Sequence, residues 1–352
     1  MTRQIKFVEA INEAMHVAMK LDSSVICYGL GVNDPKAIFG TTSNLQSAFG
    51  ATRVFDMPTS ENAMTGVAIG ASLNGIKPVM VHQRLDFFLL AMDQLVNAAA
   101  KWHYMFGNQI SVPITIRLIL GRGWGQGPTH SQNLQAWFAH IPGLKVVMPS
   151  TPESAKGLLL ASIFDPNPVL FLEHRWLHNS IGNVPEGDSR YAIGPIRTAR
   201  FGTDFTIVAS SYMVVEALHA AKYLETEGIE CEVVDLNTVN PIDWDGIYSS
   251  VEKTGRLIAL DTGYATGSVS AEIIARVAMN RMSNLKCAPV RLAMPDVPEP
   301  TSFGLTIGFF IRAGEIASTA MNMMGKDGNR ALLALKEPVP HDIPGAWFTG
   351  PF

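Results

Sequence analysis

The chain has 352 residues, of which 47% are hydrophobic and only 16% are charged. This length is enough for two domains, each with its own core, and the low charge fraction suggests that much of the surface is covered in an assembly. A net charge of −4 provides no basic field for nucleic acid, and no cluster of Lys and Arg indicates binding to an anionic membrane surface. A small molecule or another protein is therefore the expected partner.

The first residues, Met1 to Phe7, lack the apolar core of a signal peptide, and the apolar runs are too short or too interrupted to span a bilayer. Cys27, Cys231 and Cys287 are an odd number of widely spaced cysteines beside apolar residues. This pattern predicts buried thiols in a reducing compartment. We therefore expect a cytoplasmic protein.

Helices and short apolar strands alternate along the first half of the chain. Apolar residues at helical spacing predict a helix over 7–21, which a strand at 25–28 follows. The later predicted elements are a helix from Ser60, strand 79–83, helix 87–105, strand 113–119, a helix from Ser131, strand 144–148, helix 152–164 and strand 168–172. Such alternation is typical of a doubly wound parallel sheet, which we place at residues 1–185.

The segment 186–203 is rich in Gly, Pro and charge, and is interpreted as a linker. A second, smaller doubly wound α/β domain is predicted at 204–336. Its elements are strands 204–209, 231–236, 256–260 and 288–293 and helices 213–227, 242–252, 267–282 and 309–324. The Pro-rich tail, 337–352, cannot form a helix and is expected to pack across a neighbouring subunit.

One acidic residue opens the helix that is predicted after the stretch DMPTS (56–60). Ser60 is a candidate N-cap, which places Glu61 in the first turn. An acid at this position can simply offset the helix dipole. A partly desolvated carboxylate can instead share a proton near neutral pH, so Glu61 is also a candidate acid–base catalyst.

A glycine-rich loop, 121–127, precedes the sequence PTHSQ (128–132). Alternating glycines let the backbone approach a ligand closely, and His130 can move protons at physiological pH. The loop matches neither the Walker A motif nor G-x-G-x-x-G. His130 could also be an ordinary surface-loop histidine. The histidines expected to be structural or peripheral are His82, His103, His140, His174 and His178.

The order of these motifs resembles the β subunits of 2-oxo-acid dehydrogenase E1 components. The resemblance is carried by Ser60-Glu61, by Gln83 and Phe87 beyond the next strand, by His130-Ser131-Gln132, and by the run from Pro142 to Pro152. It implies a transketolase-like pyrimidine-binding domain followed by a transketolase C-terminal-like domain. It covers about the first 300 residues and loosens at 299–304, where the family usually has an apolar run near the end that docks the E2 core.

The resemblance also implies roles around thiamine diphosphate. Glu61 would be the catalytic acid at N1′ of the aminopyrimidine, Gln83 would lie at the edge of that ring, and Phe87 would stack on it. His130 would face the reacting carbon and help to handle the substrate and acyl acceptor. Arg84 stands where the family has Phe, a difference that could put a cation near the substrate channel.

The diphosphate half of the site is missing, because no Gly-Asp-Gly occurs in the chain. The resemblance therefore implies that an α subunit holds the diphosphate and Mg²⁺, in an α₂β₂ heterotetramer. Asp165 and Asn167, with backbone carbonyls near Ile114 and Thr115, match a loop that holds a structural potassium ion in some family members. Asp-Pro-Asn-Pro is also an ordinary turn.

The leading functional hypothesis is an E1-type β subunit that, with its α subunit, decarboxylates pyruvate or a similar 2-oxo acid and passes the acyl group to the lipoyl carrier of an E2 protein. The alternative is a two-chain transketolase-like transferase or carboligase that acts on a ketose without a lipoyl carrier. A third possibility, from a different class, is a non-catalytic partner subunit. The presence of Glu61, Phe87 and His130 together argues against it.

Overall fold

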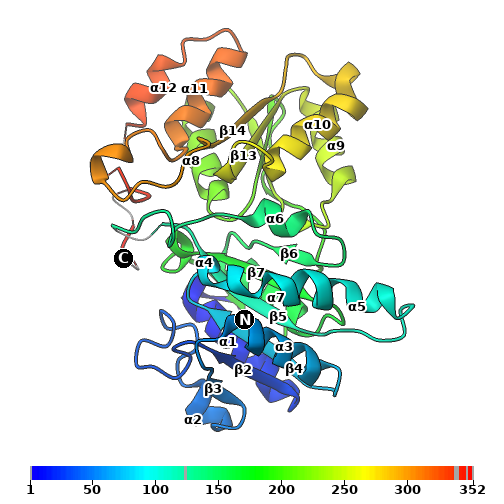
Figure 1. Cartoon of the computed structure of the whole chain (residues 1–352). Coiled ribbons are helices and arrows are strands. Elements are labelled where there is room, and N and C mark those ends of the chain that lie inside the picture. Colours follow the sequence, from blue (N-terminus) through cyan, green and yellow to red (C-terminus); the bar gives the residue numbers. More distant parts are fainter. Residues whose placement is uncertain (1, 123–124, 337–340, 346–347, 351–352) are drawn as a thin grey trace.

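The computed structural model describes residues 2–122, 125–336, 341–345 and 348–350, which form two lobes, one above the other in Figure 1. Among these residues, the N-terminal lobe is built around a seven-stranded sheet and the C-terminal lobe around a five-stranded sheet. Helices pack on both sheets, as the sequence predicts for α/β domains.

The order of strands in the first sheet is β12 (Thr238–Asn240), β6 (Lys145–Val147), β7 (Val169–His174), β5 (Thr115–Leu120), β4 (Lys77–His82), β2 (Val25–Gly29) and β3 (Val54–Asp56). All neighbours are parallel except β12, which runs antiparallel to β6. The helices of this lobe include α1 (Phe7–Leu21), α2 (Leu45–Phe49), α3 (Glu61–Ser72), α6 (Gln135–Ala139) and α7 (Pro152–Ile163). Because β2 to β7 run in one direction, their carboxyl ends share one edge.

The second sheet has the order β14 (Val290–Met294), β13 (Leu257–Tyr264), β10 (Phe205–Ala209), β11 (Cys231–Asp235) and β9 (Arg197–Arg200). Its helices are α8 (Met213–Thr226), α9 (Trp244–Thr254), α10 (Val269–Arg281), α11 (Ala313–Met323) and α12 (Asn329–Ala334). Strand β9 lies inside the segment expected to be a linker. The two lobes are joined further by β12, which leaves the second lobe to extend the first sheet.

Several elements have no counterpart in the predicted pattern. Strands β1 (Thr2–Lys6) and β8 (Ile181–Pro185) form a separate antiparallel ribbon, which contacts helices α1 and α7. Three short 3₁₀ segments lie at Arg175–Leu177 (η3), Met282–Asn284 (η4) and Phe303–Leu305 (η5). Short elements of this kind carry too few residues for a periodic signal in the sequence.

The helix predicted over 87–105 is wrong as a single regular α-helix. The observed helical run is α4 (Leu85–Phe88), η1 (Leu89–Ala91), the π-helical η2 (Gln94–Ala99) and α5 (Ala100–Met105). Helical periodicity does not distinguish these hydrogen-bonding patterns, and π turns occur often near functional sites. The change of pattern falls where this run packs against α3.

Two predicted helix starts also need correction. The helix expected from Ser131 begins at Gln135, because Gln132 and Asn133 make hydrogen bonds to distant side chains instead of entering a helix. The helix expected from residue 309 begins at Ala313, because the Phe310 side chain turns into the core before the helix starts.

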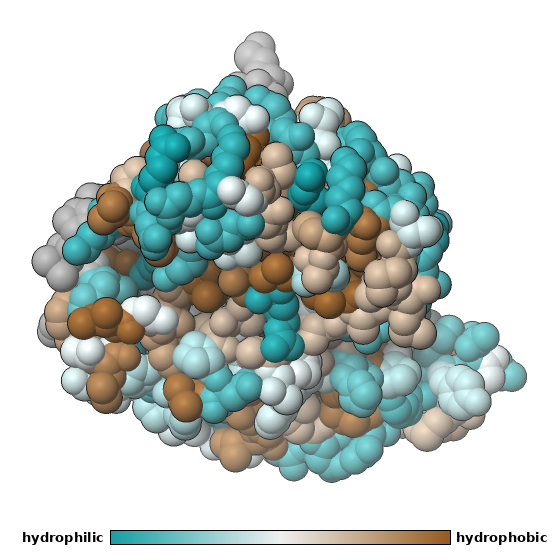
Figure 2. All heavy atoms as spheres, turned by 90° about the horizontal axis from the view of Figure 1, so that it is seen from above, coloured by the Kyte–Doolittle hydropathy of each residue, from teal (hydrophilic) through white to brown (hydrophobic). Residues whose placement is uncertain are grey.

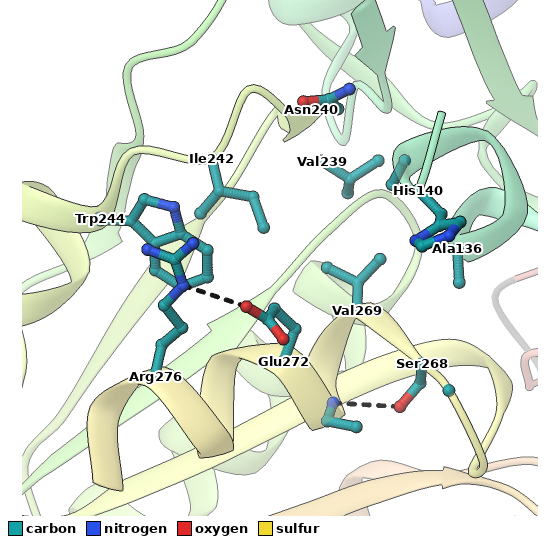
Figure 3. Close-up of a pocket in the computed structure, with 13 residues that line it drawn as sticks. Ala136, His140, Val239, Asn240, Ile242, Trp244, Ser268, Val269, Glu272 and Arg276 are labelled. Carbon is teal, nitrogen blue, oxygen red and sulfur yellow. Dashed lines mark hydrogen bonds and ion pairs between the residues drawn. The ribbon is translucent and has the colours of Figure 1, made fainter. Parts of the chain in front are cut away.

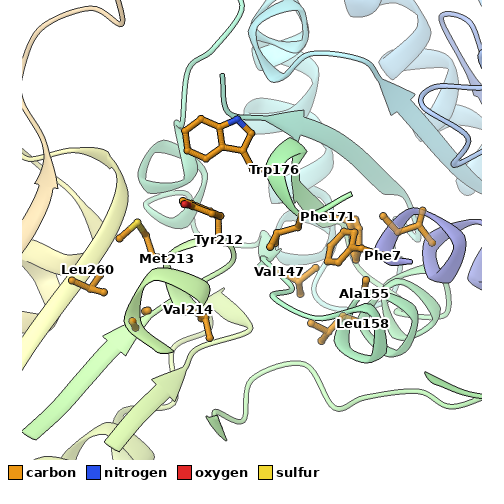
Figure 4. Close-up of a cluster of buried hydrophobic side chains, with 14 of the residues drawn as sticks. Phe7, Val147, Ala155, Leu158, Phe171, Trp176, Tyr212, Met213, Val214 and Leu260 are labelled. Atoms are coloured by element: carbon orange, nitrogen blue, oxygen red, sulfur yellow. The ribbon is translucent and has the colours of Figure 1, made fainter. Parts of the chain in front are cut away.

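An apolar cluster continues from one lobe into the other (Figure 4). Trp176, at the carboxyl end of β7, contacts the rings of Tyr212 and Phe310 from the second lobe, with centroid distances of 4.9 and 5.3 Å. The imidazole of His174 stacks on Tyr212 at 5.2 Å, and burial lowers the pKa of His174 to about 3. Aromatic pairs of this kind contribute about 0.5–1.5 kcal/mol each beyond area burial, so the lobes are packed rather than loosely tethered.

The described part of the Pro-rich tail packs on its own chain. Arg312 donates a hydrogen bond to the carbonyl of Ile343 (2.7 Å), and Asn179 donates one to the carbonyl of Gly350 (2.9 Å). Asp342 is buried and lies 3.5 Å from Arg122 of the glycine-rich loop. The remaining tail residues, among them Pro338, Pro340, Trp347 and Phe352, lie outside the described residues.

Cys27 and Cys231 are buried free thiols, and Cys287 is partly buried, so the expected thiols are confirmed for the first two positions. Burial raises the pKa of the Cys27 and Cys231 thiols to about 12. Within the part of the chain that the structure describes, no helix has both the length and the apolar character to cross a membrane.

Candidate active site

The candidate residues follow neighbouring parallel strands at one edge of the first sheet. Glu61 comes after β3, Gln83 and Phe87 come after β4, and the loop with His130 comes after β5. Arg175 follows β7, which lies next to β5. Ligands of doubly wound sheets bind outside the carboxyl ends of the strands, so this edge is the place where the fold offers a site.

Glu61 is the first residue of α3 and is only 4% exposed. The start of the helix is fixed by the Thr65 hydroxyl, which donates to the carbonyl of Glu61 (2.8 Å), and by the Tyr28 hydroxyl, which donates to the carbonyl of Met64 (2.9 Å). Ser60 occupies the N-cap position, as predicted, but its side chain makes no capping hydrogen bond. An acid that only offsets a helix dipole needs no burial, so the burial of Glu61 favours a specific role.

Gln83 is held at the end of β4 by a hydrogen bond from its Nε2 to the carbonyl of Leu30 (3.0 Å). Gly31 has a φ of +78°, and a Cβ there would lie 2.5 Å from that nitrogen. Only glycine therefore fits beside the Gln83 amide. The side chain as a whole is exposed, which leaves its other amide atom accessible.

Phe87 and His130, which are far apart in the sequence, are brought together. Their rings meet edge to face, with centroids 5.3 Å apart and an interplanar angle of 89°. Phe87 remains 37% exposed, so part of its ring is open. The Thr129 hydroxyl lies 3.0 Å from Nδ1 of His130, and the backbone N–H of His130 donates to the carbonyl of Gly127 (3.1 Å).

The His130 loop is fastened on one side to the start of α4, where the amide of Gln132 donates to Asp86 (2.8 Å). On the other side, Asn133 donates to the buried carboxyl of Glu299 (3.2 Å). Burial raises the pKa of Glu299 to about 8, although Asn133 and Arg122 act in the opposite direction. A carboxyl group at the carboxyl edge of the sheet is therefore kept largely neutral at physiological pH.

The segment that follows Glu299 closes over the same loop. Arg122 donates to the carbonyls of Pro300 and Thr301, and any side chain at Gly127 would overlap Thr301. Sequence reasoning missed Arg122 and Glu299 as part of this site. The only available signal was that residues 299–304 depart from the pattern of the family that the chain resembles. Gly123 and Trp124, in the middle of the loop, lie outside the described residues.

Comparison with known families matches the model of the transketolase pyrimidine-binding domain to residues 3–179 and that of the transketolase C-terminal domain to residues 194–311. The chain is 40% identical over 334 residues to the β subunit of an acetoin:2,6-dichlorophenolindophenol oxidoreductase of Cupriavidus necator, covering 92% of this chain and 98% of that one. It is 39% identical over 300 residues to the β subunit of the pyruvate dehydrogenase E1 component of Bacillus subtilis, covering 85% and 92%. The chain belongs to this transketolase-like family of E1 β subunits.

The fold of this chain is also similar to that of a split-gene transketolase, whose structure was solved as an inactive β4 tetramer. The TM-score is 0.74 at 21% sequence identity, and the match covers 91% of this chain and 98% of that one. Both predicted domain types, and the α/β fold class, are confirmed.

The residues of the predicted potassium site do lie close together in this E1 β family member. The Asp165 carboxylate is engaged by the ammonium group of Lys145 and accepts a hydrogen bond from the backbone N–H of Asn167 (2.9 Å). The carbonyl of Ile114 accepts a hydrogen bond from the N–H of Val169 (3.0 Å), and Thr115 pairs within the sheet. A cation from the chain itself already neutralises Asp165, and the potassium site stays a prediction.

The remaining histidines lie outside the Phe87–His130 contact. Burial lowers the pKa of His82 to about 4, and its ring packs edge-on against Phe88 at 4.9 Å. His178 lies 3.5 Å from the buried carboxylate of Glu173. His103 contacts a backbone carbonyl, and His140 lines a cavity between the lobes.

That cavity, of about 580 Å³, lies between α6, β12 and α10 (Figure 3). Arg276 and Glu272 pair across one wall, and the Arg276 guanidinium lies 4.6 Å from the centre of the Trp244 ring. The candidate catalytic residues do not line it. The candidate active site therefore lies apart from this cavity, and we expect a second subunit to complete it.

Proposed function

We propose that the chain is the β subunit of a thiamine-diphosphate-dependent E1 enzyme, which with an α subunit decarboxylates a 2-oxo acid and passes the acyl group to a lipoyl carrier. The observation that carries this proposal is a buried carboxylate, Glu61, at the same sheet edge as the contact between Phe87 and His130. The sequences of E1 β subunits support it over most of the chain.

The residues at this edge fit an aminopyrimidine ring. Glu61 is a buried acid whose carboxyl group can hydrogen-bond to a ring nitrogen, and the open part of Phe87 offers an apolar face for stacking. Gln83 is exposed and fixed by Leu30, so its free amide atom can bond the edge of the ring. When bound, thiamine diphosphate supplies the carbon nucleophile that attacks the substrate carbonyl.

His130 is positioned to act on the substrate rather than on the ring. Its imidazole is fixed by the edge contact with Phe87 and by the Thr129 hydroxyl, which holds one nitrogen. In this arrangement His130 can hold or transfer a proton at the substrate oxygen and orient the acyl acceptor. Asp86 and Glu299 hold its loop from both sides and serve as positioning residues.

The α subunit is proposed to hold the diphosphate and Mg²⁺. The chain has no Gly-Asp-Gly, and its described residues contain no group of three or more His, Cys, Asp and Glu side chains that could hold a metal ion. The proposed assembly is an α₂β₂ heterotetramer.

Hydrophobic and hydrophilic residues are interspersed over the face of the chain in Figure 2. Large apolar side chains exposed in the isolated chain include Leu90, Tyr104, Trp137, Met279, Leu305, Ile307 and Leu333.

A second candidate is a two-chain transferase or carboligase that acts on a ketose without a lipoyl carrier. One observation favours it: the segment from Glu299 to Thr301 is bound into the His130 loop and is not available as a docking element for a carrier protein. The known relatives include proteins named for acetoin and for pyruvate, so the substrate itself must be found by experiment.

The test is turnover by the chain co-purified with its α subunit, on a panel of 2-oxo acids, acetoin and ketoses, with and without a lipoyl-domain acceptor. Lipoyl-dependent turnover of a 2-oxo acid supports the first function, and aldehyde-dependent transfer from a ketose supports the second. Calorimetry should show weak or no binding of thiamine diphosphate by the isolated chain. Micromolar binding by that chain would contradict the proposed division of the site.

A further inference from the structure

Two buried arginines meet at the carboxyl edge of the first sheet. Arg84 is 6% exposed and Arg175 is 2% exposed. Both donate to the same amide oxygen, Oε1 of Gln126, at 2.6 Å from Arg84 and 3.1 Å from Arg175. The two positive charges therefore meet at one neutral amide oxygen.

Burial disfavours the charge of both arginines. Burial and, to a smaller extent, the charge of Arg84 together lower the pKa of Arg175 to about 10. Burial also lowers the pKa of Arg84, and the charge of Asp86 partly offsets this effect. Nη1 of Arg84 is buried without a hydrogen-bond partner among the described residues. A buried donor and a buried like-charge pair are both unfavourable unless an anion joins them.

Arg175, one member of the pair, is also held in place by an aromatic ring. The Arg175 guanidinium lies 4.9 Å from the centre of the Phe39 ring. Phe39 ends a run of three non-glycine residues with positive φ, Ala37 to Phe39, a conformation that L-residues rarely adopt. The strained turn thus presents an aromatic face to Arg175, which holds the guanidinium in place.

The arginines lie beside the candidate catalytic residues. Arg84 is three residues before Phe87, and Gln126 is four residues before His130. The same two segments are therefore in contact twice, once through Arg84 and Gln126 and once through the two rings. Arg84 and His130 therefore belong to the same pair of neighbouring segments, to which Arg175 is hydrogen-bonded.

We propose that Arg84 and Arg175 bind an oxyanion, a carboxylate or a phosphate, at the end of the substrate or acceptor away from the reacting carbonyl. This inference rests on the proposed function, because it places the substrate at His130. Guanidinium groups suit such an anion, since their planar donors match carboxylate and phosphate oxygens in pairs. The chain would then favour a 2-oxo dicarboxylate or a phosphorylated ketose or aldehyde over pyruvate.

Binding can be tested on the full chain without turnover. Inorganic phosphate and succinate should each be titrated while thermal melting is followed, with chloride at matched ionic strength. We expect at least one of them to raise the melting temperature of the wild type and of Arg276→Met, an exposed control arginine that pairs with Glu272. Arg84→Met should lose the shift, and Arg84→Lys should retain part of it.

The stability of the unliganded variant separates a binding role from a structural role. Removing Arg84 relieves the like-charge pair and the unpartnered donor, so unliganded Arg84→Met should melt at the wild-type temperature or above it. A clear fall in the melting temperature, or no response of the wild type to either anion, would overturn the proposal. A response to phosphate alone or to succinate alone identifies which source of oxyanion the site selects.

Kinetics with the α subunit then connect the pair to catalysis. For an anionic substrate, Arg84→Met should raise KM on the order of 10- to 100-fold and change kcat much less, as expected for loss of a charge-assisted hydrogen bond. For a neutral substrate the rise in KM should be much smaller, because such a substrate has no charge-assisted hydrogen bond to lose. Equal effects on both substrates would refute the inference. Failure of every substrate with wild-type enzyme would instead refute the proposed function, and the anion titration would still stand on its own.

Discussion

Buried charges are treated in opposite ways in the middle of the first sheet and at its carboxyl edge. Arg117 and Glu173 are fully buried on the neighbouring strands β5 and β7, where Nη2 and Nε of the arginine donate to Oε1 of the glutamate at 2.8 and 3.1 Å. At the edge, Arg84 and Arg175 share one amide oxygen. The interior of the sheet thus pairs a positive charge with a negative one, whereas the edge holds two positive charges against one amide oxygen.

The same contrast separates two buried glutamates. Burial alone would raise the pKa of Glu173, but Arg117 and His178 outweigh it and hold the pKa below the ordinary value. Glu299 has mainly an amide donor beside it, and burial raises its pKa to about 8. At these two positions, the guanidinium of Arg117 favours the ionised form of Glu173, whereas burial favours the protonated form of Glu299.

The largest expected effect concerns Glu61. If it shares a proton with the aminopyrimidine, Glu61→Gln removes the acid–base group, and kcat should fall on the order of 10²- to 10⁴-fold. If it only complements the helix dipole, the change should cost at most about 1 kcal/mol of stability and leave turnover unchanged. Proton exchange at C2 of bound thiamine diphosphate in the α/β enzyme measures the step directly. C2 proton exchange at the wild-type rate in a well-folded Glu61→Gln variant would refute the assignment of Glu61 as the acid–base group.

Glu173 should show the reverse result, a loss of stability. Glu173→Gln leaves Arg117 buried without its carboxylate, so the free energy of unfolding should fall by about 3–5 kcal/mol. The matched control is Glu272→Gln, since Glu272 pairs with Arg276 on an exposed face of α10 and should cost less than about 1 kcal/mol. Urea unfolding of both variants decides this. Similar losses in the two would show that the interior pair is no more important than a surface pair.

Glu299 should make stability depend on pH. Its pKa is about 8 in the folded chain, against an ordinary value of 4.5, so the folded state binds more protons between these pH values. The protonated carboxyl group of Glu299 therefore contributes to the free energy of unfolding. This contribution is fully present below pH 4.5 and is lost as the pH rises through 8, and its size is on the order of a few kcal/mol. Glu299→Gln should flatten the curve of unfolding free energy against pH in this window. An unchanged slope would show that Glu299 is ionised when folded.

The sequence predicted the helices and strands whose apolar residues recur at a regular spacing. Helix α1, strand β2 and the alternation around the first sheet follow from apolar periodicity, and Glu61 was found because a polar turn precedes its helix. The continuous helix expected over 87–105 and the early start at Ser131 were wrong, because tertiary hydrogen bonds at the edge replace regular helical ones.

The site could be predicted only where residues lie close in sequence or resemble a family motif. Gln83, Phe87 and His130 were named in this way, and the structure places Phe87 against His130. Arg175 and Glu299 reach the same edge from strands and loops far along the chain. No local pattern links such positions, since only the folded sheet brings them together.

The smallest expected effect compares the starts of two helices in the first lobe. Helix α7 has a regular cap, in which Thr151 Oγ1 accepts a hydrogen bond from the backbone N–H of Ser154 (3.1 Å). The side chain of Ser60 makes no such bond at the start of α3. Thr151→Ala should therefore cost about 1 kcal/mol, and Ser60→Ala less than about 0.5 kcal/mol, in urea unfolding. The open N–H groups of α3 would then be available beside Glu61, where the proposed cofactor ring binds. An equal cost at the two positions would mean that Ser60 caps α3 in solution, and the start of that helix would be closed by its own chain.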